Sequence, residues 1–559
     1  MLSYQQAIAN ALERHKKGEV GKTIPEELFT AVHPKTLYEE MPDVLDNCEE
    51  IQRQVLQEIL YLAQGSVYGE ERGLAQVTTL DEWRKIVPIT TYPDYEKYIE
   101  TEMNGTKHQL YNRDTTMVIA TTGSTGKMKY LLESEAGNAA KQLIMTVRGM
   151  YMAELLPVTL DMEAKNLTIS NYTPVGNSKD GTMIVRASGQ TARNMRKKTG
   201  TMNLLPVEFW ESYGISAWDR DYMMAVYTLA EIRFSKVFCN NVIHFGRILR
   251  RIKNEGAQMI DDIRRGYFSV EMPDEVRTTL AETFQANPSR AELLQHIFDR
   301  QGALITCPKD IREIWPNFCM ISCWMSGTVG RDAREVIQQL PHDIKCFEMG
   351  YGASESKINI PTKLASASGA AAPFACFYEF LPLDGGEPVC LWEVEDGKHY
   401  ELILTTYSGL YRYNMLDVVK IDGFIGKTPN LIFCGKSTDF IQINGQKLYG
   451  HQFADIVHEV EQEEKIIFDI VQMVNNEEGI YYILETKKKD VDFAAIKQKL
   501  DKLSEASLGV TAQGIYVMSE EYKYRLFTEA TRIDRGASGI KLPVVIAAAP
   551  VQDVLAIVK

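Results

Sequence analysis

A flat ring, a hydroxyl and a carboxylate lie within eight residues, at positions 349–356, Met-Gly-Tyr-Gly-Ala-Ser-Glu-Ser. The mostly apolar run before them, residues 344–347, is typical of a buried strand that ends in a glycine-bounded loop. Tyr351 offers its ring to a base, Ser354 its hydroxyl to a phosphate and Glu355 its carboxylate to Mg²⁺. Taken alone, the segment fits a polar turn after a core strand equally well.

A second segment, residues 118–129, leads from an apolar strand into a loop of hydroxyls and glycines that ends in lysines. Such a loop presents backbone N–H groups, hydroxyls and cationic side chains to phosphate oxygens. It is not a Walker A loop, because the spacing Gly-x-x-x-x-Gly-Lys-Ser/Thr is absent, and a plain hairpin turn is the alternative. The candidate phosphate-binding residues are Thr121, Thr122, Gly123, Ser124 and Thr125.

A third segment, residues 409–420, places Asp417 at the entrance of an apolar strand. A carboxylate in that position can accept hydrogen bonds from both hydroxyls of a ribose, as acidic residues do in other nucleotide-binding folds. The alternative is an aspartate that caps a turn. The three segments together indicate a nucleotide site more strongly than any one of them.

Composition limits the class of protein. The chain has 559 residues, more than one ordinary core holds, so we expect at least two domains. Its net charge of −14 argues against a nucleic-acid or anionic-membrane partner. Nine dispersed cysteines without a Cys-x-x-Cys pair, a polar N-terminus at residues 1–17 and no long apolar run favour a reduced cytoplasmic protein without a zinc site.

Element patterns predict an α/β fold. The first hundred residues look helical, and residues 130–340 alternate helical patterns with short apolar strands, including one at 304–306. In the amphipathic helix around 243–253, we expect Arg247, Arg250, Arg251 and Lys253 to face outward. The C-terminal part reads as α+β, with two helices and at least two strands.

The order of the three segments resembles the adenylate-forming enzymes. The closest match is the acyl acid amido synthetase family, the plant type that conjugates auxin, jasmonate and benzoates to amino acids. Residues 86–95, 314–317 with 326–327, and 410–424 also look like that family, so the resemblance runs from about residue 50 to the C-terminus. The loop at 121–129 keeps the spacing of the wider superfamily, whereas plant members usually carry an extra residue. We therefore do not expect plant-hormone specificity to follow.

The resemblance implies a large N-terminal adenylate-forming domain, residues 1–435, with mixed and parallel sheets and helices. It also implies a small mobile α+β domain at 436–559, joined by a hinge near 435–439. Lys447 matches the family's phosphate-contacting lysine, and Lys541 matches the lysine of Lys-x-Pro-Arg, although Val544 replaces the arginine. The family's nucleotide-binding residues correspond to the loop listed above together with Tyr351, Gly352, Ala353, Ser354 and Asp417; its catalytic residues correspond to Lys447, Glu355 and Lys541.

The implied function is a two-step ligase that uses ATP and Mg²⁺, with Glu355 as the metal ligand. A carboxylic acid attacks ATP to give an acyl-adenylate and pyrophosphate, and an amine, expected to be that of an amino acid, then displaces AMP. The enzyme is expected to act as a monomer. Two alternatives remain open: an acyl-CoA ligase, which a panel of acceptors separates, and a nucleotide-binding acid sensor without turnover.

Overall fold

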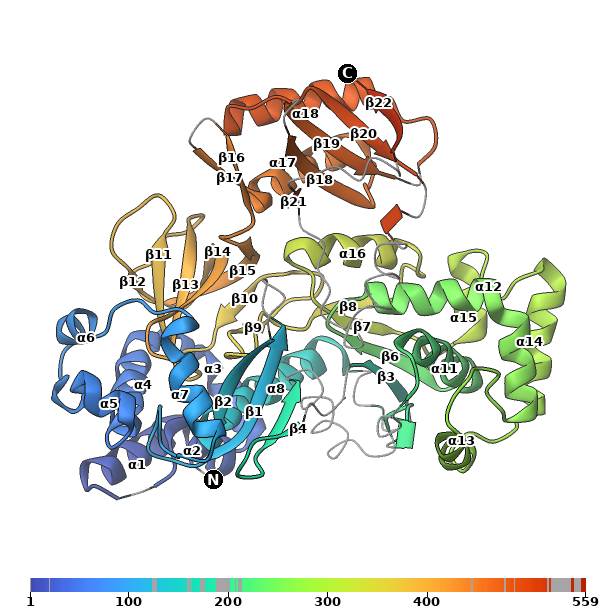
Figure 1. Cartoon of the computed structure of the whole chain (residues 1–559). Helices are drawn as coiled ribbons and strands as arrows, with labels where there is room; N and C mark the ends of the chain where they lie inside the picture. The colour runs from blue at the N-terminus through green and yellow to red at the C-terminus, as the bar shows by residue number, and fades with distance from the viewer. Residues whose placement is uncertain are drawn as a thin grey trace. The chain divides into compact units, whose positions relative to one another are not determined.

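The computed structural model contains helices and strands throughout the chain, coloured from blue at the N-terminus to red at the C-terminus (Figure 1). The structure describes residues 2–19, 21–122, 128–157, 161, 163–170, 176–186, 202–206, 208–209, 214–443, 446–476, 479–486, 488–519, 522–523, 544–546 and 554–558. These residues form two compact units, each built from separated stretches of chain. The first unit contains residues 1–163, 170–202 and 346–433; the second contains 164–169, 203–345 and 434–559.

The first unit begins with short helices, as the sequence predicts. Proline and capping residues set several of their starts: Thr79 caps one with Glu82 three positions inside, and Pro93 opens another. The helices of this unit are α1 (Tyr4–Lys16), α2 (Ile24–Ala31), α3 (Pro34–Asp46), α4 (Cys48–Ala63), α5 (Val67–Arg72), the 3₁₀ helix η1 (Leu74–Gln76), α6 (Leu80–Ile86), α7 (Pro93–Met103) and α8 (Glu135–Leu155).

Two sheets complete the first unit. One has the order β2-β1-β5-β4, with β1 antiparallel to β2 and parallel to β5. The other has the order β12-β11-β13-β14-β15-β10-β9, and its recorded pairings are antiparallel. Their strands are β1 (Thr115–Thr122), β2 (Met128–Ser134), β4 (Gly176–Asn177), β5 (Met183–Arg186), β9 (Asn359–Pro361), β10 (Gly369–Ala371), β11 (Phe377–Pro382), β12 (Val389–Cys390), β13 (His399–Thr405), β14 (Tyr413–Ile425) and β15 (Thr428–Lys436).

The core of the first unit joins residues that are far apart in the chain. Gln52 of α4 is fully buried and donates hydrogen bonds of 2.6 and 2.7 Å to the carbonyls of Pro373 and Cys376. Its side-chain oxygen accepts the backbone N–H of Tyr378 at 2.9 Å. A buried amide whose groups are all bonded fixes one arrangement of helix and sheet, because each lost bond leaves a desolvated polar atom.

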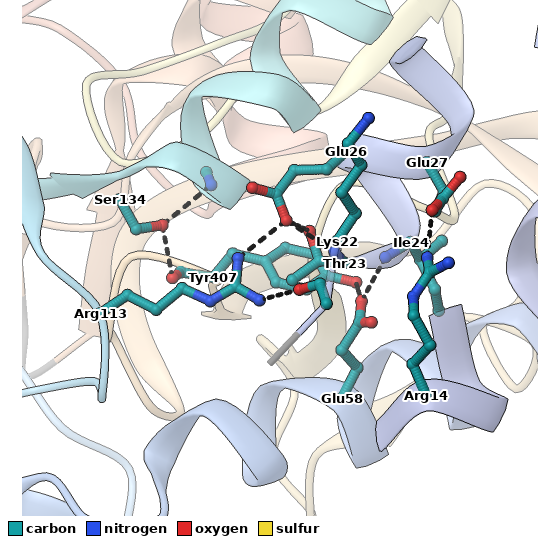
Figure 2. A network of polar contacts seen from close by, with 12 residues as sticks. Arg14, Lys22, Thr23, Ile24, Glu26, Glu27, Glu58, Arg113, Ser134 and Tyr407 are labelled. Carbon is teal, nitrogen blue, oxygen red and sulfur yellow. Dashed lines mark hydrogen bonds and ion pairs between the residues drawn. The ribbon is translucent and has the colours of Figure 1, made fainter. Parts of the chain in front are cut away.

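A buried polar network links the first helices to the turn after β13 (Figure 2). Glu58 Oε2 accepts hydrogen bonds from the Ile24 backbone N–H at 2.7 Å and the Tyr407 hydroxyl at 2.9 Å. Nearby, Arg113 donates to Glu26 at 2.9 Å, and the Ser134 hydroxyl donates to the Tyr407 carbonyl at 2.8 Å. The network positions Ser134, the N-cap of α8, and α8 carries residues of the candidate site.

The second unit has a parallel sheet covered by helices. Its order is β3-β6-β7-β8, with β3, β6 and β7 parallel. Burial of every residue of β6 fits a strand covered on both faces. These elements are β3 (Lys165–Ile169), α11 (Ala217–Ala230), β6 (Phe234–Cys239), α12 (Ile243–Arg265), α13 (Asp274–Ala281), α14 (Pro288–Gln301), α15 (Pro308–Ile314), β7 (Met320–Cys323), α16 (Gly327–Gln338) and β8 (Lys345–Glu348).

The C-terminal part has the predicted α+β character. A mixed sheet of order β21-β18-β19-β20-β22 packs on two helices, and β16 pairs with β17 (Figure 1). These elements are β16 (Phe440–Ile443), β17 (Gln446–Tyr449), α17 (Gly450–Glu464), β18 (Ile470–Asn476), β19 (Gly479–Glu485), α18 (Phe493–Leu508), β20 (Gly514–Met518), β21 (Val545–Ile546) and β22 (Val554–Val558).

Two expectations from the sequence were wrong. Residues 304–306 form no strand but lie in the bends between α14 and α15. Arg247 and Arg251 do not face outward: Arg247 is buried in an ion pair with Asp221, and Arg251 lies 4.3 Å from the centre of the Trp218 ring. Helix α12 packs against α11, α14 and α16, so part of its charged side is covered. Among the described residues, no helix combines the length and the hydropathy that crossing a membrane requires.

Candidate active site

Residues 349–357 form a tight loop directly after β8. Gly350 has a φ of 88°, a left-handed conformation that favours glycine, and its N–H donates to Glu348 Oε1 at 2.9 Å. The Tyr351 N–H donates to the side chain of buried Asn359 at 2.7 Å. The Ala353 N–H donates to the Ser356 carbonyl at 2.9 Å, and Gly352 pairs with Lys357 in a short antiparallel bridge. The loop is therefore held by its own backbone and by β9.

Tyr351 and Asp417 lie in direct contact. The Tyr351 hydroxyl donates to Asp417 Oδ2 at 2.6 Å, and both side chains are buried. The Tyr351 ring stacks on Phe433 with centroids 5.1 Å apart. Burial, and after it the Asp417 carboxylate, raises the pKa of Tyr351 well above its ordinary value. The structure thus brings the residue predicted for the base next to the one predicted for the ribose, with Phe433 against the ring.

Glu355 and Tyr413 come from the same two segments. Burial, followed by the charges of Glu355 and Asp417, raises the pKa of Tyr413, so both carboxylates lie near its phenol. Magnesium is commonly held by one or two carboxylates together with substrate phosphates. Two carboxylates near one phenol are a donor set that fits an ion arriving with a nucleotide.

Two cations of α8 hold the loop from one side. Lys141 Nζ donates to the Ser354 carbonyl at 2.9 Å and forms an ion pair with buried Glu133. Arg148, which is 3% exposed, donates to the Met349 carbonyl at 2.5 Å. Burial lowers the pKa of Arg148 to about 10. Both ends of the loop are thereby fixed by charged donors, which make stronger hydrogen bonds than neutral ones.

Lys357 is a third cation beside the loop. Its side chain is partly exposed, and no hydrogen bond or ion pair joins its ammonium group to any residue that the structure describes. Burial lowers the pKa of Lys357 to about 8, and the nearby charges of Lys141 and Arg148 act in the same direction.

The hydroxyl–glycine loop is only partly described. Thr121 and Thr122 end β1, where they pair with Lys129 and Met128 of β2. The prediction of a strand leading into the loop is therefore confirmed. Gly123, Ser124 and Thr125 lie outside the described residues, and for Thr122 the structure describes the backbone alone.

The predicted lysines of the C-terminal part belong to the second unit. Lys447 is exposed on β17, with Nζ 4.6 Å from the centre of the Phe440 ring. Lys541 lies outside the described residues. Val544, which replaces the arginine of the family pattern, is buried in the core of the C-terminal sheet, and its carbonyl accepts the Met473 N–H at 2.8 Å. A cation at this position would have to lie in an apolar core.

Sequence reasoning missed Lys141, Arg148 and Lys357. The two α8 residues are seven apart, which places them on one face of a helix, and this spacing is the signal that was available. No sequence pattern points to Lys357, because the direction of its side chain is evident only in the folded structure.

A separate hollow of about 470 Å³ lies on the first unit. Its lining combines apolar side chains such as Leu56, Leu60 and Phe377 with Arg53, which lies 5.0 Å from the centre of the Trp392 ring. None of the candidate site residues lines it. The hollow is thus distinct from the nucleotide loops.

Two family models match the chain. The GH3 family N-terminal domain matches residues 37–340, and the GH3 family central domain matches residues 369–436. Two of the three predicted nucleotide segments, residues 118–129 and 409–420, fall within the matched residues, and residues 349–356 lie between the two matched stretches.

The similar proteins are named as synthetases that join an acid to an amino acid. The chain is 27% identical over 464 residues to the jasmonoyl–L-amino acid synthetase JAR4 of Nicotiana attenuata, covering 78% of this chain and 77% of that protein. It is 23% identical over 509 residues to the indole-3-acetic acid-amido synthetase GH3.15 of Arabidopsis thaliana, covering 83% and 82%. A solved structure of the GH3.15 acyl acid amido synthetase in complex with 2,4-DB matches with a TM-score of 0.80 at 18% identity, over 96% of this chain and 98% of that one. That likeness shows the same fold.

Proposed function

The chain belongs to the GH3 family and is an acid–amino acid ligase of the adenylate-forming kind, and from this premise we propose which of its residues carry each part of the reaction. The substrates we propose are ATP with Mg²⁺, a carboxylic acid and an amino acid. The observation that supports this most is the hydrogen bond between Tyr351 and Asp417, which joins the two predicted nucleotide segments into one site.

In the first step, a carboxylate oxygen attacks the α-phosphorus of ATP, and pyrophosphate leaves with the electron pair of the broken P–O bond. Charge neutralisation and positioning matter more here than acid or base groups. We propose that Asp417 accepts the ribose hydroxyls, that the Tyr351 ring lies against adenine, and that Ser354 with Thr122, Ser124 and Thr125 binds phosphate oxygens. Bound Mg²⁺ would neutralise charge on the phosphates, and Glu355 would hold it.

In the second step, the amine attacks the acyl carbon, and AMP leaves with the electrons of the broken C–O bond. The amine must have lost its ammonium proton before it attacks. We propose that Lys447 and Lys541 contact phosphate oxygens, each in the step that brings its ammonium near them. The family resemblance motivates both assignments.

The proposed reaction is tested by ATP–pyrophosphate exchange. Exchange should require an added carboxylic acid and Mg²⁺, with jasmonate, indole-3-acetate, benzoates and fatty acids as the panel. Product analysis with an amino-acid panel against coenzyme A then identifies the acceptor. Absence of exchange with every acid would count against adenylation, and a thioester product would replace the amide assignment.

We propose that the enzyme works as a monomer in the cytoplasm. Its nine cysteines are all free thiols, and eight of them are at least partly covered in the folded chain, as suits a reducing compartment. Sedimentation of the purified protein and localisation of a tagged chain test the two parts of this proposal.

A further inference from the structure

We propose that Lys357 binds the carboxylate of the acid substrate and so selects an ionised acid for adenylation. The inference rests on the function proposed above and deepens it by assigning a residue to the acid. Three observations carry it: the path of the side chain, the charges around it and the free hydrogen-bonding capacity of its ammonium group.

The path of the side chain depends on Gly352. A Cβ atom added to Gly352 would lie 2.6 Å from Lys357 Cδ and 3.3 Å from Lys357 Nζ. The lysine therefore runs back across the glycine, along the loop that carries Tyr351 and Glu355, instead of extending into solvent. Gly352 has an ordinary φ, so its lack of a side chain serves this close approach and not a left-handed turn.

The neighbouring charges leave Lys357 without a counter-ion. Lys141 is paired with Glu133 and bonded to the Ser354 carbonyl, and Arg148 is bonded to the Met349 carbonyl. Both cations act on Lys357, and no hydrogen bond or ion pair from its ammonium group reaches a described residue. An ammonium group that lies near two other cations without a counter-ion is unfavourable, and a bound anion would remove that cost.

The acid carboxylate fits this position better than a phosphate. A carboxylate carries one negative charge, which a single ammonium group can neutralise. The phosphates of ATP are expected to arrive with Mg²⁺ and to contact the hydroxyl–glycine loop. Of the two reactants of the first step, ATP and the acid, the acid is the one whose charge has no other partner in the proposed site.

The test compares Lys357→Met with Lys357→Arg. Methionine keeps the apolar path across Gly352 and removes the charge, so the KM for the acid in pyrophosphate exchange should rise about 10- to 100-fold, as expected for loss of a charged hydrogen bond. The KM for ATP should change little. Arginine keeps the charge and should restore much of the acid affinity. Lys363→Met, an exposed lysine six residues further on, is the matched control and should leave both constants unchanged.

A second measurement separates charge recognition from a structural effect. The primary amide of the best acid is tested as a competitive inhibitor of the wild-type enzyme and of Lys357→Met. The variant should lose affinity for the acid but not for the neutral amide. Equal losses for acid and amide, a rise in the KM for ATP alone, or no change in either constant would each overturn the assignment. If the wild-type enzyme shows no exchange with any acid, the proposed function fails first, and that result is distinct from a change confined to the variant.

Discussion

The Tyr351 hydroxyl lies 2.6 Å from Asp417 Oδ2 and so ties the loop after β8 to the middle of β14. The two residues are 66 positions apart in the chain. Because both are buried, the position of the ring and the position of the carboxylate depend on each other. The two residues predicted for base and ribose therefore act as one element of the site.

Removing that hydroxyl should weaken nucleotide binding. In Tyr351→Phe, a buried Asp417 oxygen loses a donor, and we expect the KM for ATP to rise about tenfold, with a smaller change in kcat, because the contact is present before and during the reaction. Tyr95→Phe is the control, since the Tyr95 hydroxyl is buried and donates to the Tyr411 carbonyl at 2.7 Å in the same unit. It should lower Tm without changing the KM for ATP. Equal KM values for both variants would contradict the role of the pair.

Glu355→Gln should act mainly on kcat. The change keeps the size of the side chain and removes the charge that we assign to Mg²⁺, so adenylation should slow about 10²-fold or more. The Mg²⁺ concentration for half-maximal exchange should rise as well. Glu401→Gln, whose side chain accepts a hydrogen bond from Asn414 at 2.6 Å, is the control on a neighbouring strand. An unchanged Mg²⁺ dependence in Glu355→Gln would remove the metal assignment.

Lys541→Ala should separate the two half-reactions. A lysine contributes only to a step in which its charge lies near the phosphate in the transition state, so formation of the adenylate should be impaired and transfer from a pre-made acyl-adenylate largely spared. Single-turnover kinetics of each half-reaction measure this. Lys499→Ala on α18, whose lysine pairs with Glu463 at 3.0 Å, is the control. An equal loss in both steps would indicate a structural role.

Gly352→Ala and Lys357→Ala should be strongly non-additive. The new methyl group collides with Lys357 Cδ, so it should displace the lysine and raise the KM for the acid. In a Lys357→Ala background there is no lysine left to displace, and the same substitution should cost much less. A double-mutant cycle in pyrophosphate exchange gives the coupling. Additive effects would mean that the two side chains act independently.

The stability of the first unit should depend on pH through two buried groups, whose effects oppose each other between pH 4.5 and 6.5. Burial raises the pKa of Glu58 to about 8 from 4.5, so the folded state holds a proton that the unfolded chain releases, and stability falls as pH rises between these values. Burial also lowers the pKa of His15 from 6.5 to about 4, so the unfolded chain binds a proton first, and stability falls as pH drops through that range.

Glu58→Gln isolates the contribution of Glu58 to this dependence. The variant has no carboxyl to ionise, so the decline in unfolding free energy above pH 4.5 should become shallower by up to about 1.4 kcal/mol per pH unit. Urea denaturation at a series of pH values measures the slope. Glu50→Gln, an exposed change on the same helix, is the control. An unchanged slope in Glu58→Gln would show that this carboxyl is ionised in the folded protein.

The sequence predicted those parts of the site that depend on short segments. The strand before residue 349, the strand before the hydroxyl–glycine loop and the α+β pattern near the C-terminus follow from local periodicity, and all are present. Asp417 was expected at the start of a strand, but it lies inside β14, because the strand begins at Tyr413.

The contacts between α8 and the loop after β8 join residues more than 200 positions apart. Lys141 reaches Ser354 and Arg148 reaches Met349 at separations of 213 and 201 positions. No local pattern encodes which loop a helical cation will meet. The prediction that Arg247 faces outward was wrong for a related reason. Which side of an amphipathic helix is exposed depends on the elements that pack against it.

The discontinuous first unit has a consequence for synthesis on the ribosome. Helix α4 is complete once residue 63 has emerged, yet Gln52 finds its partners at Pro373, Cys376 and Tyr378, more than 300 positions later. Most of the second unit's parallel sheet is translated in between. The apolar surface of α4 that packs on the later sheet therefore stays exposed while residues 203–345 of the second unit are being translated. Slow translation would lengthen that exposure, so the yield of folded enzyme should depend on the rate of elongation and on chaperones that shield a nascent chain.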